Sequence, residues 1–273
     1  MILTSVAGIA PRAASAGQQG DALVRRALAS ELRHARDPDH PMRYQLRRSS
    51  PRLTTTKEIY ETRDGAVARL MEVNDKPLSP AEDQKEQKRL DALLNDPSKQ
   101  LHRKQQEEED TKRVLKVLSL LPTAYIYTFE SYENSSSGQL ARYSFRPNPQ
   151  FDPPDMETQV MSAMSGILLV NVAQERVVKL EGHLTRDVDF GWGILGRLYK
   201  GGWIVIEQAD VGWNQWRIVH FRMQMSGRVL FKSKVFDTVQ ETSEFAPVPV
   251  GLSYVQAIKM LRAGPKGIQQ AER

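Results

Sequence analysis

The sequence predicts an α+β fold, in which a strongly curved antiparallel sheet or half-open β-barrel carries helices on its concave side or rim. From residue 124 onward, apolar and polar residues alternate with a period of two in one run after another. Turn-forming residues separate these runs at short intervals, which is typical of antiparallel strands. About eight to ten strands with a single apolar face would curl rather than lie flat, and helices would then fill the concave side.

The first part of the chain should form one helix and three strands. Leu23, Leu28 and Leu32 give an apolar stripe at helical spacing, which predicts a helix over residues 21–36. Asp64-Gly65 is a hairpin signal between the second and third of the strand-like runs. These runs cover residues 43–49, 53–62 and 66–74.

A charged helical arm is predicted over residues 79–121. Ser79 and Glu82 have the spacing of a capping box, followed by proline at the first helical position, so a helix should begin there. Asp96-Pro97 repeats this signal, and the second helix should run until Pro122. Most of the arm is charged on all sides, and only its last third is apolar, so that end should pack on the sheet. A coiled coil is less well supported, because no heptad repeat is sustained.

The remainder of the chain predicts further strands and a last helix. The strands cover residues 124–133, 139–146, 166–172, 176–190, 203–208, 215–225 and 228–239. The helix should cover residues 253–263 and end at a Gly-Pro pair. Because no second core is evident, residues 19–243 are predicted to form one domain. A leader precedes it (residues 1–18), and a tail with the short helix follows it (residues 244–273).

The composition excludes several classes of protein. The net charge of +5 over 273 residues is too small to indicate nucleic-acid binding. The chain contains no cysteine, so it has no disulfide, thiolate metal site or cysteine nucleophile. No apolar run approaches the roughly 20 residues of a transmembrane helix. The five histidines show no metal-ligand spacing and no G-x-S-x-G occurs, so no metal, cofactor or catalytic residue is expected.

The N-terminus resembles the end of a secretory signal peptide. A short apolar stretch covers residues 2–10, and an A-x-A site follows at Ala14-Ser15-Ala16, but the basic region that begins such peptides is missing. A start site placed too far downstream would explain this, which predicts a periplasmic or secreted protein. The alternative is a disordered leader on a cytoplasmic protein.

Three glycines at positions 191, 193 and 196 spell G-x-G-x-x-G, the phosphate-binding pattern of dinucleotide enzymes. That pattern requires a helix that begins at the glycines, so that its N-terminus meets the pyrophosphate. Here the chain passes through another glycine pair directly into a strand. The glycines are therefore interpreted as a wide loop or bend between two antiparallel strands.

The strand before these glycines carries two polar features. Asp187 and Asp189 form a carboxylate pair of the kind used in glycoside hydrolysis, but they share a face with Lys179 and His183, which favours a solvated surface. Arg186 is a cation within the apolar row. It could bind a carboxylate or phosphate group beside apolar walls, or it could extend from the rim of the barrel to solvent.

The candidate ligand-binding residues are Arg186, Phe190, Trp192 and Trp203, which are predicted to lie at the mouth of a cavity. All four tryptophans of the chain, which are the two named above together with Trp213 and Trp216, are expected at one end of the sheet. There they could line a ligand mouth or a partner surface. The simpler alternative is that these aromatic residues belong to the core and its rim.

Two long segments suggest a family. "YSFRPNPQFDPPDMETQVMSAMSG" and "LEGHLTRDVDFGWGILGRLYKGGWIVIEQ" resemble an uncharacterised family of exported bacterial proteins, typical of soil bacteria such as acidobacteria. The resemblance covers about residues 56–239, with "KPLSPAEDQKEQKRLDALLNDPS" as a further landmark. It implies export but no catalytic residues.

The order of elements is also remotely similar to that of the lipoprotein-localisation carriers (LolA/LolB-like), which sort outer-membrane lipoproteins. That resemblance implies an incomplete barrel covered by helices, with an apolar cavity for acyl chains. It is architectural and not based on motifs, so it carries function only by analogy. The charged helical arm is larger than the lid of such a carrier requires.

The sequence therefore favours a non-catalytic envelope protein that binds a lipid, an acylated protein or another apolar ligand in the concavity of the sheet. The long inward apolar alternation, the export-like N-terminus and the lack of a catalytic constellation motivate this hypothesis. The alternative is an interaction module of the cell envelope, whose charged arm and tryptophan-rich end bind a protein partner. A hydrolase that uses acidic residues is the third hypothesis.

Overall fold

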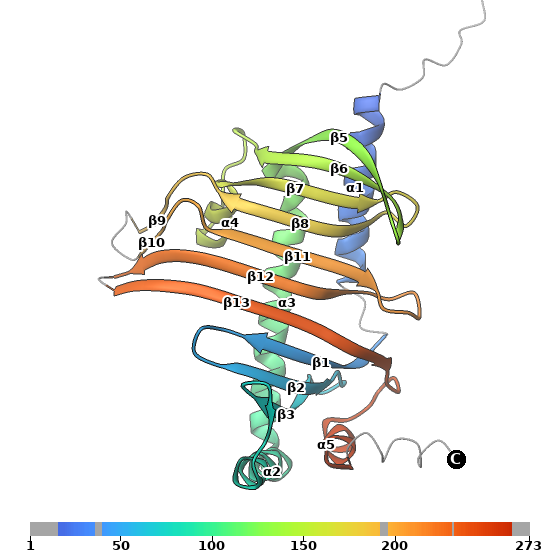
Figure 1. Cartoon of the computed structure of the whole chain (residues 1–273), viewed down its shortest axis with the longest axis vertical. Helices are drawn as coiled ribbons and strands as arrows, with labels where there is room; N and C mark the ends of the chain where they lie inside the picture. Colours follow the sequence, from blue (N-terminus) through green and yellow to red (C-terminus); the bar gives the residue numbers. More distant parts are fainter. Residues whose placement is uncertain (1–15, 36–39, 192–195, 231, 264–273) are drawn as a thin grey trace, which may run out of the picture.

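The computed structural model describes residues 16–35, 40–191, 196–230 and 232–263 (Figure 1). Its helices are α1 (Ala16–His34), α2 (Pro80–Asn95), α3 (Pro97–Ala124), α4 (Met156–Met161) and α5 (Tyr254–Ala263). Its strands are β1 (Met42–Ser49), β2 (Thr54–Tyr60), β3 (Val67–Val73), β4 (Lys76–Pro77), β5 (Tyr125–Ser135), β6 (Gly138–Pro147), β7 (Met164–Asn171), β8 (Arg176–Leu184), β9 (Val188–Phe190), β10 (Gly196–Leu198), β11 (Trp203–Asp210), β12 (Trp216–Val229) and β13 (Lys232–Pro247).

The predicted α+β class is confirmed. The described strands form one 13-stranded sheet, in the order β4-β3-β2-β1-β13-β12-β11-β8-β7-β6-β5, with β9 and β10 attached beside β12. Neighbouring strands are antiparallel, and β4 and β5 lie at its two ends, so the sheet does not close into a barrel. The strand β1 pairs with β13, which joins the beginning of the chain to its end in the middle of the sheet.

The predicted helical arm is present as α2 and α3. The Ser79 hydroxyl accepts a hydrogen bond from the Glu82 amide, and the Glu82 carboxylate accepts one from the Ser79 amide, which completes the capping box. The second helix does not end before Pro122 but continues to Ala124. Leu121 and Ala124 are buried, and this packing holds the last turn in place although proline cannot donate its backbone hydrogen bond.

Two predicted strand boundaries are wrong. The run 176–190 divides into β8 and β9, because the backbone bends at residues 185–187. The turn expected after Met225 is absent, and β12 continues to Val229. A Cβ atom on Gly227 would lie 2.3 Å from the carbonyl oxygen of Arg197, so this glycine admits the backbone of β10 rather than turning the chain.

The apolar interior consists of two clusters, where the sequence suggested one core. The large cluster joins α1 and the end of α3 to strands β5–β8, and includes Val24, Leu28, Leu121, Tyr143, Leu168 and Leu184. The small cluster joins β2 and β3 to α2 and α5, and includes Tyr60, Val67, Leu90, Ile258 and Leu261. α5 therefore packs into the interior, and β13 continues to Pro247, past residue 243 at which the predicted domain ends.

Helix α3 extends from one cluster to the other behind the sheet (Figure 1). Its 28 residues give it a length of about 42 Å, at about 1.5 Å per residue. Residues 105–114 are all exposed, so this part of the helix buries no apolar face, although the Glu107 carboxylate accepts a hydrogen bond from the amide of Ala66 at 2.8 Å. The helix is therefore held at its two ends.

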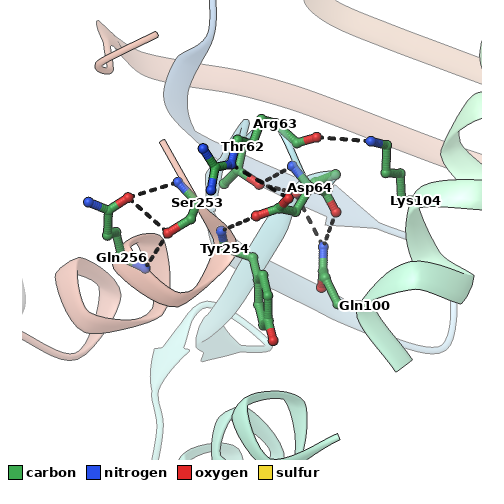
Figure 2. A network of polar contacts seen from close by, with 9 residues as sticks. Thr62, Arg63, Asp64, Gln100, Lys104, Ser253, Tyr254 and Gln256 are labelled. Carbon is green, nitrogen blue, oxygen red and sulfur yellow. Dashed lines mark hydrogen bonds and ion pairs between the residues drawn. The ribbon is translucent and has the colours of Figure 1, made fainter. Parts of the chain in front are cut away.

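The N-terminal end of α3 is held by the turn between β2 and β3 (Figure 2). The Gln100 side-chain amide donates to the carbonyl oxygen of Asp64 at 2.9 Å, and Lys104 donates to that of Arg63 at 3.1 Å. On the other side of the turn, the Asp64 carboxylate accepts from the backbone amide of Tyr254 at 3.1 Å. The turn thus connects α3 to α5.

Replacing Gly65 by alanine should lower the free energy of unfolding by about 3 kcal/mol. Gly65 has φ +90°, and a Cβ atom there would lie 3.1 Å from Cα and Cβ of Lys104. The backbone conformation alone costs roughly 1–2 kcal/mol, and displacement of α3 adds about 1–3 kcal/mol. Gly201 is the matched control, because its φ is +88° and a Cβ atom there would have no neighbour within 4 Å. Equal losses for the two variants in urea denaturation would contradict the contact with α3.

Candidate functional site

A cleft of about 590 Å³ opens beside β9, where strand β8 ends. Its walls come from the loop after β6, from α4, and from the bend between β8 and β9. The lining residues are Pro147, Asn148, Pro149, Phe151, Pro153, Gln159, Ser162, Arg186, Asp187, Val188 and Asp189. The cleft therefore brings together the two segments that carry the suggested family resemblance.

The loop after β6 is fixed to the end of α3. The backbone amide of Asn148 donates to Ala124 at 2.9 Å, and its side chain donates to the carbonyl oxygen of Thr123 at 2.9 Å. Asp155 caps α4 by accepting from the amide of Thr158 at 3.0 Å, and it also pairs with Lys116 of α3. These contacts place the proline-rich loop as one wall of the cleft.

Arg186 supplies a positive charge to the opposite wall. It follows Thr185, which is held in the bend by two hydrogen bonds to the carbonyl oxygen of Ala163, at 2.8 and 2.9 Å. The Arg186 guanidinium donates to the carbonyl oxygen of Ser162 at 3.2 Å and to its hydroxyl at 3.0 Å. With the described residues Arg186 makes no ion pair, so its partners are all neutral oxygen atoms.

The two carboxylates of the cleft are held by Arg197 of β10. Asp189 forms a two-point ion pair with this guanidinium, at 2.5 and 3.0 Å, and Asp187 lies 3.6 Å from it. Asp187 also accepts from the amide of Lys200 at 2.8 Å. The hydrogen bond and charge of Asp189 raise the pKa of Arg197 above its ordinary value. These contacts account for both carboxylates as ties between β9 and β10.

The other predicted site residues lie apart. Phe190 is half-buried against the large cluster and faces Gly196 of β10. Trp203 lies on the other face of the sheet from Ile204, which packs against the large cluster. Its indole donates to Gln224 at 3.1 Å, and Arg222 lies 5.0 Å from its ring. Trp192 lies outside the described residues. Ligand binding by these residues remains a prediction.

The remaining tryptophans do not gather with Trp203. In the β11–β12 pairing, Trp203 faces Gln224 and Trp216 faces Asp210, so the two lie at opposite ends of the hairpin. Trp213 is 58% exposed in the turn, and Trp216 is buried with Arg176 above its ring. The structure therefore does not form a tryptophan-rich end from the described residues.

A smaller cavity of about 200 Å³ lies between α1, the end of α3 and β5. Val24, Leu28, Pro122, Tyr125 and Tyr127 contribute to its lining. Burial raises the pKa of both tyrosines, so they are neutral at physiological pH. Sequence reasoning missed this cavity, because its walls come from segments about a hundred residues apart.

Between the two clusters, the inner face of the sheet is incompletely covered. Ile206 of β11 faces Phe221 of β12, and both are half-buried. Their neighbours Ile204 and Met223 pack against the large cluster. The middle of this face is thus less completely covered than the part that belongs to the large cluster.

Metal-binding groups and membrane-spanning helices are both missing from the described residues. These residues contain no group of three or more histidine or acidic side chains placed to hold a metal ion. None of the helices described is long and apolar enough to cross a membrane.

No protein-family model matches the chain, and no curated protein matches it. Among solved structures, the chain is similar to a domain from Vibrio parahaemolyticus that is provisionally assigned to outer-membrane lipoprotein sorting. The two share 11% identity, with a TM-score of 0.31, and the similarity covers 87% of this chain and 100% of that domain. At this level the similarity carries no conclusion about function, and the acidobacterial family resemblance remains a prediction.

Proposed function

We propose that this protein is a non-catalytic protein of the cell envelope, which binds a lipid, an acylated protein or another amphipathic ligand in the cleft beside β9. One observation carries the proposal: Arg186, a cation without an ionic partner among the described residues, lies in the wall of a cleft of about 590 Å³. Ligand sites in proteins typically measure about 300–1,000 Å³ and combine apolar walls with a few polar groups.

The chemistry of the walls suggests how such a ligand would bind. Phe151 and the prolines of the loop supply apolar surface for an alkyl or ring system. Arg186 can bind a carboxylate or phosphate group through two parallel hydrogen bonds, if it releases Ser162. A charged head beside an apolar body is therefore the kind of ligand that fits.

Replacing Arg186 by glutamine should weaken binding of an anionic amphiphile about three- to tenfold. The probe is anilinonaphthalene sulfonate, which has an apolar ring system and one negative charge and fluoresces when it leaves water. A charge-assisted hydrogen bond contributes roughly 1.5–3 kcal/mol when it is buried, and the exposure of Arg186 reduces this to about 0.7–1.4 kcal/mol. Arg113→Gln is the control, because Arg113 is an exposed arginine of α3, far from the cleft in the sequence and in contact with Asp110.

The natural ligand is sought by native mass spectrometry of the protein purified without detergent. A retained mass that organic solvent removes, and that Arg186→Gln retains less well, supports the proposal. Equal probe affinities for Arg186→Gln and Arg113→Gln, together with the absence of a retained mass, would refute it.

An interaction module of the envelope is the second candidate function. It is favoured by α3, whose exposed residues 105–114 carry a dense set of charges between two anchored ends. The hydrolase hypothesis has less support, because Asp187 and Asp189 already contact Arg197.

A further inference from the structure

The end of the β12–β13 hairpin exposes apolar side chains to solvent. Val229, Leu230, Val235 and Phe236 are 45%, 52%, 70% and 40% exposed. In the pairing of β12 with β13, Val229 faces Lys232, Ser226 faces Val235 and Met225 faces Phe236, so both faces of the same short ribbon carry exposed apolar side chains. Single exposed apolar residues are ordinary, but a group of them marks a surface that meets a partner. We call residues 226–230 and 232–236 the hairpin tip.

The hairpin tip projects from the sheet. β1 pairs with β13 only from Val239 to Pro247, so within the described sheet residues 232–238 have β12 as their one neighbouring strand. β10 borders the tip on the other side through residues 227–229 of β12. Figure 1 shows the two strands extending past the end of β1. The tip is therefore accessible from both of its faces.

The charges of the hairpin tip all have one sign. Arg228, Lys232 and Lys234 are exposed, and the sequence from Ser226 to Phe236 contains no aspartate or glutamate. Neither lysine forms an ion pair with any residue in the described parts of the chain. The first acidic residue is Asp237, which pairs in register with Gln224. The tip is thus an apolar and cationic surface.

We propose that the hairpin tip docks the protein on an anionic lipid bilayer. Apolar side chains that enter the interface of a bilayer, with cations near the lipid head groups, are the combination that holds proteins on such membranes. Val229 and Phe236 lie on one face of the ribbon and Val235 on the other. A protein partner would cover one face, whereas a bilayer surrounds an inserted ribbon, so this arrangement favours the membrane.

The hairpin tip and the cleft lie on the same side of the sheet, where strands β8 and β12 end. β10 pairs with β12 at residues 227–229 and with β9 at residues 188–190, so it connects the tip to the wall of the cleft. A docked protein would therefore hold the cleft close to the bilayer. The membrane inference deepens the proposed function, but its observations do not include the cleft.

Single cysteines allow a direct test, because the chain contains none. Val235→Cys carries an environment-sensitive fluorophore at the tip, and Val250→Cys carries it at a control site outside the tip. The two valines have similar exposed fractions, 70% for Val235 and 76% for Val250. Vesicles of phosphatidylcholine with about 30% phosphatidylglycerol, an anionic lipid, should raise and blue-shift the fluorescence at position 235 and leave that at position 250 unchanged. Vesicles of phosphatidylcholine alone should produce little change at either position.

The contribution of charge is measured by vesicle sedimentation. Lys232→Gln with Lys234→Gln should reduce binding to the anionic vesicles about 25-fold, at about fivefold per cation. Lys85→Gln with Lys88→Gln is the matched control, because both lysines are exposed on α2 and the net charge changes equally. High salt should weaken binding of the unmodified protein in the same way.

Three outcomes would overturn the proposal. The first is an equal response of the two labels to anionic vesicles. The second is an equal loss of vesicle affinity in the two double lysine variants. The third is burial of the label at position 235 without vesicles as the protein concentration rises, which would show contact between copies of the chain. Arg186→Gln separates the two proposals. It should weaken binding of the anionic amphiphile about three- to tenfold, whereas the label at position 235 should still respond to the anionic vesicles, so either proposal can fail without the other.

Discussion

Replacing Glu31 by glutamine should lower the free energy of unfolding by about 3–5 kcal/mol. Glu31 of α1 and Arg176 of β8 form an ion pair inside the protein, with side chains only 9% and 4% exposed. Removing one charge of a buried pair leaves the other without compensation in a medium that solvates it poorly, and this costs about 3–5 kcal/mol. Urea unfolding monitored by circular dichroism measures the loss.

The contacts of Glu31 explain why the expected loss is large. Its carboxylate accepts from Arg176 at 2.9 and 3.0 Å, from the amide of Val177 at 2.9 Å and from Gln208 at 3.2 Å. The guanidinium of Arg176 also lies 5.5 Å from the ring centroid of Trp216. One carboxylate therefore connects α1 to the start of β8 and to β11.

Glu175→Gln is the matched control. Glu175 is the residue before Arg176, and it pairs with Arg26 of α1 at 2.6 Å. These side chains are 37% (Glu175) and 54% (Arg26) exposed. Exposed ion pairs contribute about 0–1 kcal/mol, so this variant should lose little stability. A Glu31→Leu, Arg176→Met double variant should recover part of the loss of Glu31→Gln, because it leaves no buried charge but removes the acceptor of the Val177 amide. Similar losses for Glu31→Gln and Glu175→Gln would refute the role of burial.

Replacing Gly166 by alanine should destabilise the protein by about 4 kcal/mol or more, or prevent it from folding. Gly166 of β7 faces Gly182 of β8, and a Cβ atom on Gly166 would lie 1.8 Å from the carbonyl oxygen of Glu181. No side chain can move to relieve this overlap, because the obstructing oxygen belongs to the backbone. The two strands would have to separate in the middle of the large cluster.

Gly182→Ala tests the same strand pair with a smaller obstacle. The nearest atom to its Cβ position is the terminal methyl of Met164 at 2.8 Å, and a flexible methionine can withdraw. We expect a loss of about 1–2 kcal/mol for this variant. Soluble yield and the urea midpoint distinguish the two. A folded Gly166→Ala protein with the stability of Gly182→Ala would show that the strands tolerate separation.

Most of the secondary structure could be predicted because it rests on local signals. Period-two alternation identified the strands that have one buried face, and the Ser79–Glu82 capping box marked the start of α2. Ser226-Gly227 misled the prediction, because glycine serves a turn and a close strand contact equally well. What distinguishes them is the position of β10, which is not a local property of the sequence.

The candidate site was predictable only in part, because it depends on the bend after β8. The sequence singled out Arg186 as a cation within an apolar row, and in the structure Arg186 is one of the residues that line the cleft. The apolar row assigned to it requires a continuous strand, whereas the bend at residues 185–187 changes the direction in which each side chain points. Trp203 was predicted with Arg186 at the mouth of a cavity; it does not line the cleft beside β9, and its indole donates to Gln224. The small cluster was missed because α2, α5 and β2 meet only in the folded chain.

Helix α3 runs in a straight line from the small cluster to the large cluster of the curved sheet. It contacts the sheet towards its two ends, through Gln100 and Glu107 at the turn between β2 and β3 and through Leu121 in the large cluster, while residues 108–114 are exposed to solvent. The length of a helix that is fixed at both ends is determined by its number of residues, at about 1.5 Å per residue. A helix fixed at both ends in this way limits how far the two clusters can move apart, although the residues in its middle bury no apolar face.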